Sequence, residues 1–168
     1  MGLYTLDSGE RYVETRTQGR IPFTSLYQRL FAYVPQGNRL MRGSIREVVS
    51  FGTELDASND EALWEALRLA CADDFVAQIP DALDANLGEL GSGLSEGQMQ
   101  RISIARAIFS GHPVLMLDES TSALDADTEE RLLTNLRDLA GRTIVVVSHR
   151  QTVVDICDQR LHFGGEEL

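Results

Sequence analysis

Two segments, LSEGQMQRISIARA at residues 94–107 and VLMLDESTSALD at residues 114–125, decide the fold of this chain. In the first, Ser95 and Gln98 have the spacing of a capping box, and Gly111 and Pro113 follow the segment, which together predict a helix from Glu96 to about Phe109. The second opens with four consecutive apolar residues, as is typical of a parallel strand buried on both faces. A helix followed directly by such a strand predicts an α/β fold.

Two adjacent carboxylates, Asp118 and Glu119, end this predicted strand. Ligands of open parallel sheets bind outside the carboxyl ends of the strands. Neighbouring residues of a strand point to opposite sides, so one carboxylate can hold Mg²⁺ through water while the other orients or deprotonates an attacking water. Taken alone this pattern is a weak signal, because any strand that ends in an acidic turn produces it.

The rest of the chain predicts further strands and helices of the same fold class. Strands are expected at residues 31–34 and, as a second central strand, at residues 143–148, with a strand or hairpin within residues 1–20 and a hairpin at residues 161–166. Helices are expected from Thr24 or Ser25 to Leu30, from a capping box at Ser58 to about Ile79, and after Asp125 or Asp127, where Leu132, Leu133, Leu136 and Leu139 have core spacing.

Composition limits the function classes. The 168 residues are 43% hydrophobic and 24% charged, which is enough for one domain with its own core. A net charge of -11 disfavours nucleic acid and anionic lipid as partners. Cys71 and Cys157 fit no metal-site spacing and are expected to be free thiols. All 15 basic residues are Arg, so the sequence holds no lysine that could serve a phosphate-binding P-loop.

The motifs together resemble the ATP-binding-cassette (ABC) ATPases. Residues 94–107 are similar to the family's signature sequence, residues 114–119 to its Walker B strand, and residues 122–125 to its D-loop. His149, between Ser148 and Arg150, stands where the family has its switch histidine. The resemblance implies a partial RecA-like P-loop NTPase core, a mostly parallel sheet flanked by helices, with an inserted helical subdomain that carries the signature motif.

The resemblance also implies roles for individual residues. Glu119 would be the catalytic base, assisted by His149 and Gln36, and Asp118 with Gln36 would hold Mg²⁺, partly through water. Ser95, Gly97 and Gln98 lie at the first turn of a helix, where free amides and the helix dipole favour a γ-phosphate. Glu96 departs from the commonest signature, which has glycine there, so its carboxylate must point away. Asp125 is expected both to cap a helix and to lie at a dimer interface.

Two further segments resemble the exporter branch of the family. Gln36 follows a predicted strand, as in the Q-loop, and residues 40–47 are similar to the segment beneath the coupling helices of a membrane domain. Residues 86–91 resemble the loop before the signature of exporters, where Glu89 would contact a transmembrane partner. A solvated glycine-rich loop is the simpler interpretation of that short motif.

The sequence therefore predicts one N-terminally truncated ABC ATPase domain over residues 1–168. Its parts are β-strands and Q-loop at 1–38, the helical subdomain at 39–109, and the Walker B, D-loop and switch-histidine part at 110–168. Because the P-loop is lacking, the chain is expected to be a fragment that is inactive alone and leaves an apolar strand edge unpaired near residues 143–148.

The expected parent is an exporter that uses ATP and Mg²⁺ at the cytoplasmic face of the plasma (inner) membrane. Its partners would be a transmembrane domain and a second nucleotide-binding domain in a head-to-tail dimer, with no nucleic acid. One alternative is the carboxyl-terminal lobe of an SMC-like chromosome ATPase, which the acidic charge and the position of Gln36 oppose. Another is a degenerate regulatory cassette, which Glu119 and His149 oppose.

Overall fold

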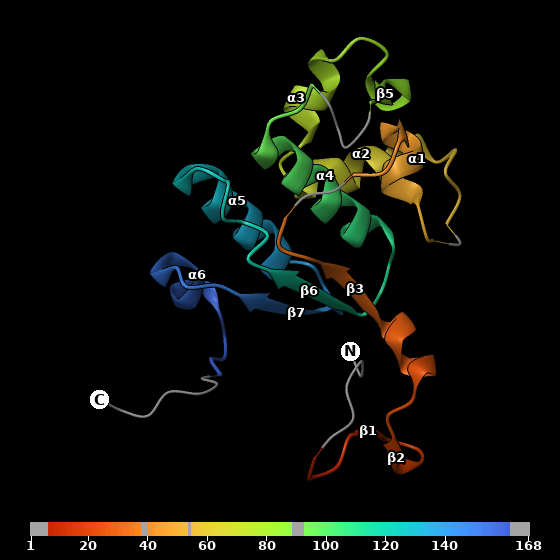
Figure 1. Ribbon diagram of the computed structural model, residues 1–168, viewed down its shortest axis with the longest axis vertical. Coiled ribbons are helices and arrows are strands. Elements are labelled where there is room, and N and C mark those ends of the chain that lie inside the picture. Colours follow the sequence, from red (N-terminus) through yellow and green to blue (C-terminus); the bar gives the residue numbers. More distant parts are fainter. Residues whose placement is uncertain (1–6, 38–39, 54, 89–92, 162–168) are drawn as a thin grey trace.

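The centre of the fold is a parallel sheet. The computed structural model describes residues 7–37, 40–53, 55–88 and 93–161. In it β6 (Val114–Asp118) lies between β3 (Phe31–Val34) and β7 (Thr143–Val147), and all three strands are parallel. Apolar residues of the strands pack against helices on one side of the sheet (Figure 1). The predicted α/β fold class is confirmed.

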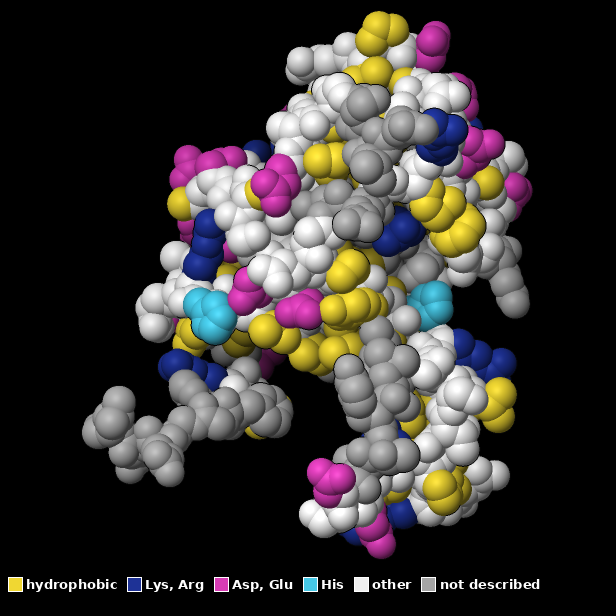
Figure 2. All heavy atoms as spheres, in the orientation of Figure 1, with side chains coloured by type: hydrophobic (Ala, Val, Ile, Leu, Met, Phe, Trp, Pro, Cys, Tyr) yellow, Lys and Arg dark blue, Asp and Glu magenta, His cyan; other side chains and the backbone are white. Residues whose placement is uncertain are grey.

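The described helices cover only one face of this sheet. Leu115 and Leu117 of β6 are fully buried among them. The residues that alternate with them stay accessible: Val114 and Met116 are only half-buried, so the expectation that residues 114–117 are buried on both faces is wrong. The second face, called the bare face below, is formed by Tyr33, Met116, Val145 and Val147. Apolar side chains gather over these strands in Figure 2.

Strand β7 lies at the edge of the sheet within the described part of the chain. It pairs with β6 alone, so residues 143–148 do not form the second central strand that the valine run predicts. Val145 and Val147 are 40% and 47% exposed. This is the unpaired apolar edge expected from the family resemblance, and such edges favour pairing with another strand.

The helical subdomain lies above the sheet in Figure 1. It contains α1 (Ile45–Ser50), α2 (Asp60–Leu69), α3 (Asp73–Gln78), a 3₁₀ turn η2 (Ala82–Asp84), and a two-stranded antiparallel sheet of β4 (Gly43–Ser44) and β5 (Asn86–Leu87). Its last helix, α4 (Glu96–Phe109), begins and ends where the sequence predicts.

The start of α2 differs from the prediction. Asn59, rather than Ser58, is the N-cap, and its side chain accepts a hydrogen bond from the Ala62 amide at 3.1 Å. Ser58 is engaged elsewhere, because both its amide and its hydroxyl donate to Asp56 Oδ1 at 2.8 Å. The predicted capping box at Ser58 is therefore wrong, since that residue belongs to an Asx turn one step earlier.

The helical region from residue 60 to about Ile79 is also not continuous. Cys71 adopts a left-handed conformation with φ of 55°, which separates α2 from α3. Its carbonyl oxygen accepts a hydrogen bond from Arg101 Nη1 of α4 at 2.7 Å, and that guanidinium lies 4.8 Å from the Phe75 ring centroid. Asn135 Nδ2 donates to the Leu69 carbonyl at 3.1 Å, so two other helices stabilise the break.

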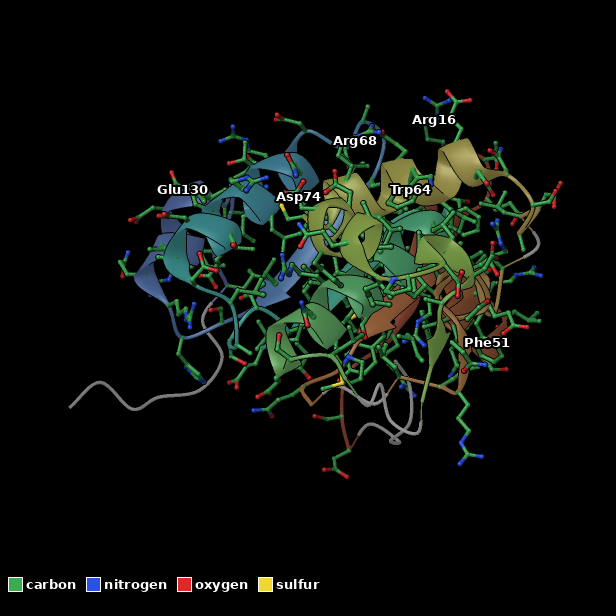
Figure 3. All side chains as sticks on the ribbon, turned by 90° about the horizontal axis from the view of Figure 1, so that it is seen from above. Arg16, Phe51, Trp64, Arg68, Asp74 and Glu130 are labelled. Atoms are coloured by element: carbon green, nitrogen blue, oxygen red, sulfur yellow. The ribbon has the colours of Figure 1, made fainter. Side chains whose placement is uncertain are left out.

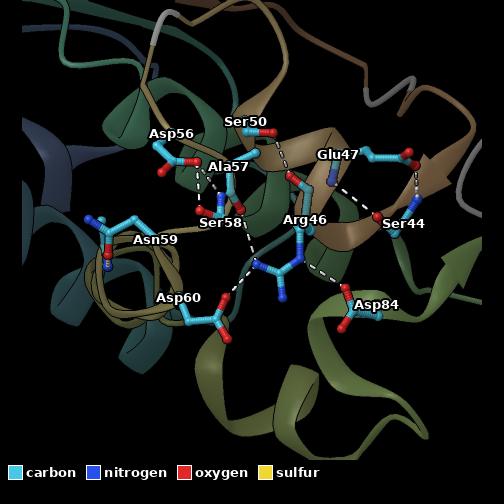
Figure 4. A network of polar contacts seen from close by, with 11 residues as sticks. Ser44, Arg46, Glu47, Ser50, Asp56, Ala57, Ser58, Asn59, Asp60 and Asp84 are labelled. Atoms are coloured by element: carbon cyan, nitrogen blue, oxygen red, sulfur yellow. Dashed lines mark hydrogen bonds and ion pairs between the residues drawn. The ribbon is translucent and has the colours of Figure 1, made fainter.

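Arg46 joins the parts of the subdomain (Figure 4). Its Nε donates to Asp84 Oδ1 at 2.9 Å, and its Nη1 donates to the Ala57 carbonyl at 3.0 Å and to Asp60. These contacts, first of all the hydrogen bond to Asp84, raise the pKa of Arg46 above its ordinary value. One side chain thus connects α1, the segment before α2, and η2.

Helix α4 belongs to both halves of the molecule. It packs on α1 and α2 of the helical subdomain and on β3 of the sheet. Its buried residues Ile102, Ile104 and Ala105 join a single hydrophobic cluster that extends from Val48 in α1 to Leu117 in β6. The helical subdomain and the sheet therefore share one core.

The remaining elements lie at the ends of the described chain. The predicted N-terminal hairpin is formed by β1 (Tyr12–Thr15) and β2 (Gly19–Pro22), with Arg20 over the Tyr12 ring at 4.4 Å. The helix after Thr24 is a 3₁₀ helix, η1 (Ser25–Leu30), without a side-chain cap. Helices α5 (Ala126–Arg137) and α6 (Gln151–Ile156) follow the D-loop and β7. The predicted hairpin at residues 161–166 lies mostly outside the described residues.

Viewed from above, Figure 3 shows Arg68 and Asp74 near Glu130 of α5. They line a charged crevice of about 540 Å³ between α2, α3 and α5, which none of the expected site residues borders. Within the described residues, no helix combines the length and the apolar character required to cross a membrane.

Candidate nucleotide-hydrolysis site

Three strand ends meet at Glu119. Gln36 follows β3, Glu119 follows β6, and His149 follows β7. Gln36 Nε2 donates to Glu119 Oε2 at 2.8 Å, and His149 Nε2 lies 3.0 Å from Glu119 Oε1. The parallel order of the strands brings these residues together, because all three carboxyl ends lie at the same edge of the sheet. The group is called the Glu119 cluster below.

The backbone turns sharply at Glu119. Its φ is 46°, a left-handed conformation that is costly for a residue with a side chain. The Glu119 amide still donates to the Val147 carbonyl at 3.0 Å, so the turn begins while the residue is bound to the neighbouring strand. The turn directs the carboxylate towards Gln36 and His149, where it is 28% exposed and open to a water molecule.

Asp118 is held separately on the bare face. The Tyr33 hydroxyl donates to Asp118 Oδ2 at 2.8 Å, and this hydrogen bond, followed by burial and the carboxylate charge, raises the pKa of Tyr33. Asp118 and Gln36 offer oxygen ligands suited to Mg²⁺. Among the described residues there is no cluster of three or more His, Cys, Asp or Glu arranged for a metal. The chemistry of Asp118 and Gln36 fits a Mg²⁺ ion, which these two side chains would hold partly through water.

The N-terminus of α4 has the predicted capping box. The Gln98 amide donates to Ser95 Oγ at 3.2 Å, and the Ser95 amide donates to Gln98 Oε1 at 2.8 Å. The first hydrogen bond within the helix runs from Met99 to the Ser95 carbonyl, so the amides of Glu96 and Gly97 precede it and point outwards. Glu96 is exposed, as is Ser95 beside it.

Gly97 brings this helix into contact with the D-loop. A Cβ atom on Gly97 would lie 2.9 Å from the Ala123 carbonyl oxygen. The neighbouring Gln100 is almost fully buried, and its Oε1 accepts a hydrogen bond from the Ala123 amide at 3.2 Å. In the described residues no hydrogen bond or ion pair links Ser95, Gly97 or Gln98 to the Glu119 cluster. The contacts of the signature end and those of the Glu119 cluster therefore involve different sets of residues.

Asp125 is the N-cap of α5, where its Oδ1 accepts a hydrogen bond from the Thr128 amide at 3.0 Å. The hydrogen bonds from Thr128, the backbone one first, hold the pKa of Asp125 below its ordinary value. Of the two residues that the sequence offers, Asp125 rather than Asp127 caps the helix. Glu89, the expected coupling residue, lies outside the described residues.

A hollow of about 300 Å³ lies beside Phe51, which is 56% exposed. Burial lowers the pKa of Arg106, which lines this hollow. His112 lines it too, and its Nδ1 is buried without a hydrogen-bond partner among the described residues. None of the sequence motifs includes His112, and the structure places its unmatched Nδ1 atom at a concave surface.

Sequence reasoning missed three residues of this region. Tyr33 binds Asp118, Gln100 binds the D-loop, and Arg150 donates to the D-loop carbonyl of Ser122 at 2.8 Å. Tyr33 lies within the predicted strand at residues 31–34 and Arg150 directly follows His149, so their positions in the sequence were the available signal. Gln100 lies within the signature sequence, where only its apolar neighbours indicate burial.

Comparison with known proteins places this geometry in a family. The sequence model described as ABC transporter matches residues 1–122. The cyclolysin secretion/processing ATP-binding protein CyaB of Bordetella pertussis is 38% identical over 167 residues, which are 99% of this chain and 23% of that protein. A multidrug resistance ABC transporter ATP-binding and permease protein of Lactococcus lactis is 44% identical over 125 residues, 73% of this chain and 21% of that protein.

A solved structure agrees with these relatives. The structure of a bacterial Atm1-family ABC exporter with ATP bound matches with a TM-score of 0.69 and 32% identity, over 76% of this chain and 22% of that one. The fold is therefore a partial P-loop NTPase core, as the sequence predicts. The chain belongs to the ABC transporter family. It spans less than a quarter of the length of the relatives named above.

Proposed function

We propose that this chain supplies the Q-loop, signature helix, Walker B strand, D-loop and switch histidine of an ATP-hydrolysing domain in an ABC exporter. The observation that carries the proposal is the pair of contacts to Glu119, one from Gln36 at 2.8 Å and one from His149 at 3.0 Å. A carboxylate held from two sides at a strand end suits general-base catalysis on a water molecule.

In this proposal Glu119 accepts the proton of the attacking water. Gln36 and His149 fix the orientation of its carboxylate, and the exposed imidazole of His149 reaches towards the γ-phosphate. Asp118 and Gln36 hold Mg²⁺, partly through water. The ion supplies charge neutralisation for the phosphate oxygens. Tyr33 keeps the Asp118 carboxylate at the strand end through its 2.8 Å hydrogen bond.

The signature end serves a second site. Ser95, Gly97 and Gln98 lie at the N-terminus of α4, and we assign them to the γ-phosphate of an ATP held by another nucleotide-binding domain, as the family resemblance implies. This requires a head-to-tail dimer with Asp125 at the interface. The absence of lysine from the sequence supports the further proposal that this chain alone neither binds ATP tightly nor hydrolyses it.

A transmembrane domain is the second proposed partner, at the cytoplasmic face of the plasma (inner) membrane. The hollow beside Phe51 fits such a contact, because it offers an exposed aromatic ring together with Arg106 and the unmatched Nδ1 of His112. Apolar side chains of the partner would cover the Phe51 ring, and a hydrogen-bond acceptor of the partner would pair with the polar atoms of Arg106 and His112. Glu89 is proposed as an additional coupling residue.

A chimera tests the hydrolytic role. The 167 aligned residues of this chain replace the corresponding segment of the Bordetella CyaB protein, which supplies the remaining sequence of its own chain. We expect ATP hydrolysis that Glu119→Gln abolishes, while Glu130→Gln, an exposed carboxylate on α5, leaves it unchanged. A correctly inserted chimera without ATPase activity would refute the proposal. ATP turnover by the isolated chain, lost in Glu119→Gln, would refute its inactivity.

A further inference from the structure

The D-loop is held through its backbone by side chains from two other elements. Arg150 Nη2 donates to the Ser122 carbonyl at 2.8 Å, and Arg150 Nη1 donates to the Leu124 carbonyl at 3.4 Å. Between them, the Ala123 amide donates to Gln100 Oε1 at 3.2 Å. Three successive D-loop residues are therefore each fixed by a contact that does not depend on their own side chains.

Glu129 determines where Arg150 lies. The Glu129 side chain is 2% exposed, and its carboxylate accepts hydrogen bonds from Arg150 Nη1 at 2.9 Å, Thr121 Oγ1 at 2.6 Å and Thr152 Oγ1 at 3.2 Å. A buried carboxylate is stable only when it is paired and hydrogen-bonded. The carboxylate thus draws the guanidinium inwards, and the fork of Arg150 can reach the D-loop carbonyls at the same time.

The contacts of Arg150 and Gln100 connect the D-loop to two other motifs of the chain. Arg150 directly follows His149 and is the N-cap of α6, whereas Gln100 belongs to the signature helix. We propose that Arg150 is a positioning residue that fixes the D-loop backbone against the loop carrying His149, so that Asp125 and His149 face a partner domain in one set geometry. The function of these Arg150 contacts, called the D-loop lock below, rests on the proposed ATPase role. Their effect on the D-loop backbone can nevertheless be measured without ATP.

The test uses the full 168-residue chain and two NMR readouts, amide hydrogen exchange and the ring resonances of His149. Arg150→Lys keeps a charge beside Glu129 but lacks the fork that reaches both carbonyls. We expect it to retain most of the stability of the unmodified chain, while exchange at Ala123 and Leu124 accelerates about tenfold and the His149 ring resonances shift. Arg137→Met, a half-exposed arginine of α5 paired with Asp138 at 3.6 Å, should change neither.

Arg150→Met leaves Glu129 buried without its counter-charge and can fail to fold for that reason alone. The double variant Arg150→Met/Glu129→Gln removes both charges and should show the same accelerated D-loop exchange as Arg150→Lys. Unchanged exchange and an unshifted His149 in either folded variant would overturn the proposal. Failure of both variants to fold would also overturn it, because Arg150 would then serve stability only. An inactive chimera with a correctly locked D-loop would instead refute the proposed function.

Discussion

A Cβ atom placed on Gly97 would lie 2.9 Å from the carbonyl oxygen of Ala123. The backbone of the signature helix therefore lies directly against the backbone of the D-loop. A side-chain carbon at position 97 would not fit there unless one of the two backbones moved. The glycine that the sequence assigns to phosphate binding also sets the distance between two motifs. Its replacement should disturb the D-loop even when no nucleotide is present.

Gly97→Ala tests this contact. An alanine inside an exposed helix normally stabilises it relative to glycine, by up to about 1 kcal/mol. Here the added methyl group meets a backbone carbonyl that must move, so we expect the free energy of unfolding to fall by about 1–3 kcal/mol. Urea denaturation followed by circular dichroism measures the sign directly. An increase in stability would show that the helix and the D-loop separate without cost.

Position 119 tests the strained turn after β6. Glu119→Gly and Glu119→Ala both remove the carboxylate and its contacts to Gln36 and His149, so they differ mainly in backbone freedom. At φ of 46° we expect the glycine variant to be more stable than the alanine variant by about 1 kcal/mol, the reverse of the order in a helix. Equal unfolding free energies for the two variants would contradict a left-handed conformation at this residue.

Acidification tests the cap of α5. Because the pKa of Asp125 is lowered in the folded state, its contribution to stability is present above the unfolded pKa and is lost as the pH falls through the folded pKa. We expect Asp125→Asn, which can still cap the helix, to match the unmodified chain at pH 7 but to lose less stability below about pH 4. Asp127→Asn, which does not alter the cap, should lose as much stability in acid as the unmodified chain. Thermal unfolding between pH 7 and pH 3 provides the comparison.

Arg46 tests the connection within the helical subdomain. Arg46→Met removes the hydrogen bond to the Ala57 carbonyl together with the contacts to two carboxylates, and we expect a loss of about 1–3 kcal/mol in unfolding free energy. The matched control is Arg68→Met, since Arg68 is 62% exposed and, among the described residues, its ion pair is with Glu65 of its own helix. That variant should change stability by less than about 0.5 kcal/mol. Similar losses of unfolding free energy in both variants would mean that the contacts of Arg46 add no specific stability.

The bare face and the open edge of β7 predict self-association. Val145 and Val147 are exposed on a strand whose outer edge has no partner among the described residues. We expect concentration-dependent oligomers in size-exclusion chromatography with light scattering, and a shift towards monomer in Val145→Lys. Arg142→Lys, at the end of the preceding loop, keeps the charge and leaves the face unchanged. A clean monomer of the unmodified chain at high concentration would count against this expectation.

Local signals in the sequence predicted the elements well. The capping box at Ser95 located the start of α4, and Gly111 and Pro113 located its end, because helix ends depend on residues that are neighbours in the chain. The carboxyl ends of the strands brought Gln36, Glu119 and His149 together, since three parallel strands leave little freedom at that edge. Asn59 and Ser58, by contrast, both suit an N-cap, and only the turn at Asp56 decides between them.

What the sequence could not predict depends on register and on close approach. Tyr33 meets Asp118 across 85 positions only because their strands align with one particular offset. Glu129 and Arg150 are 21 positions apart and carry no motif that joins them. The left-handed Cys71 has no glycine or proline beside it, so nothing local indicates the end of α2. These features follow from packing between elements rather than from any single segment.

Helix α4 packs on α1 and α2 with one side and on β3 with another. A chain built in this way cannot release its helical subdomain while keeping the sheet intact, because doing so would leave half of α4 in water. The subdomain and the sheet should consequently lose their structure together, as a single cooperative unit, although their outlines suggest two. The helix that carries the signature motif is thus also the element that couples the unfolding of the subdomain to the unfolding of the sheet.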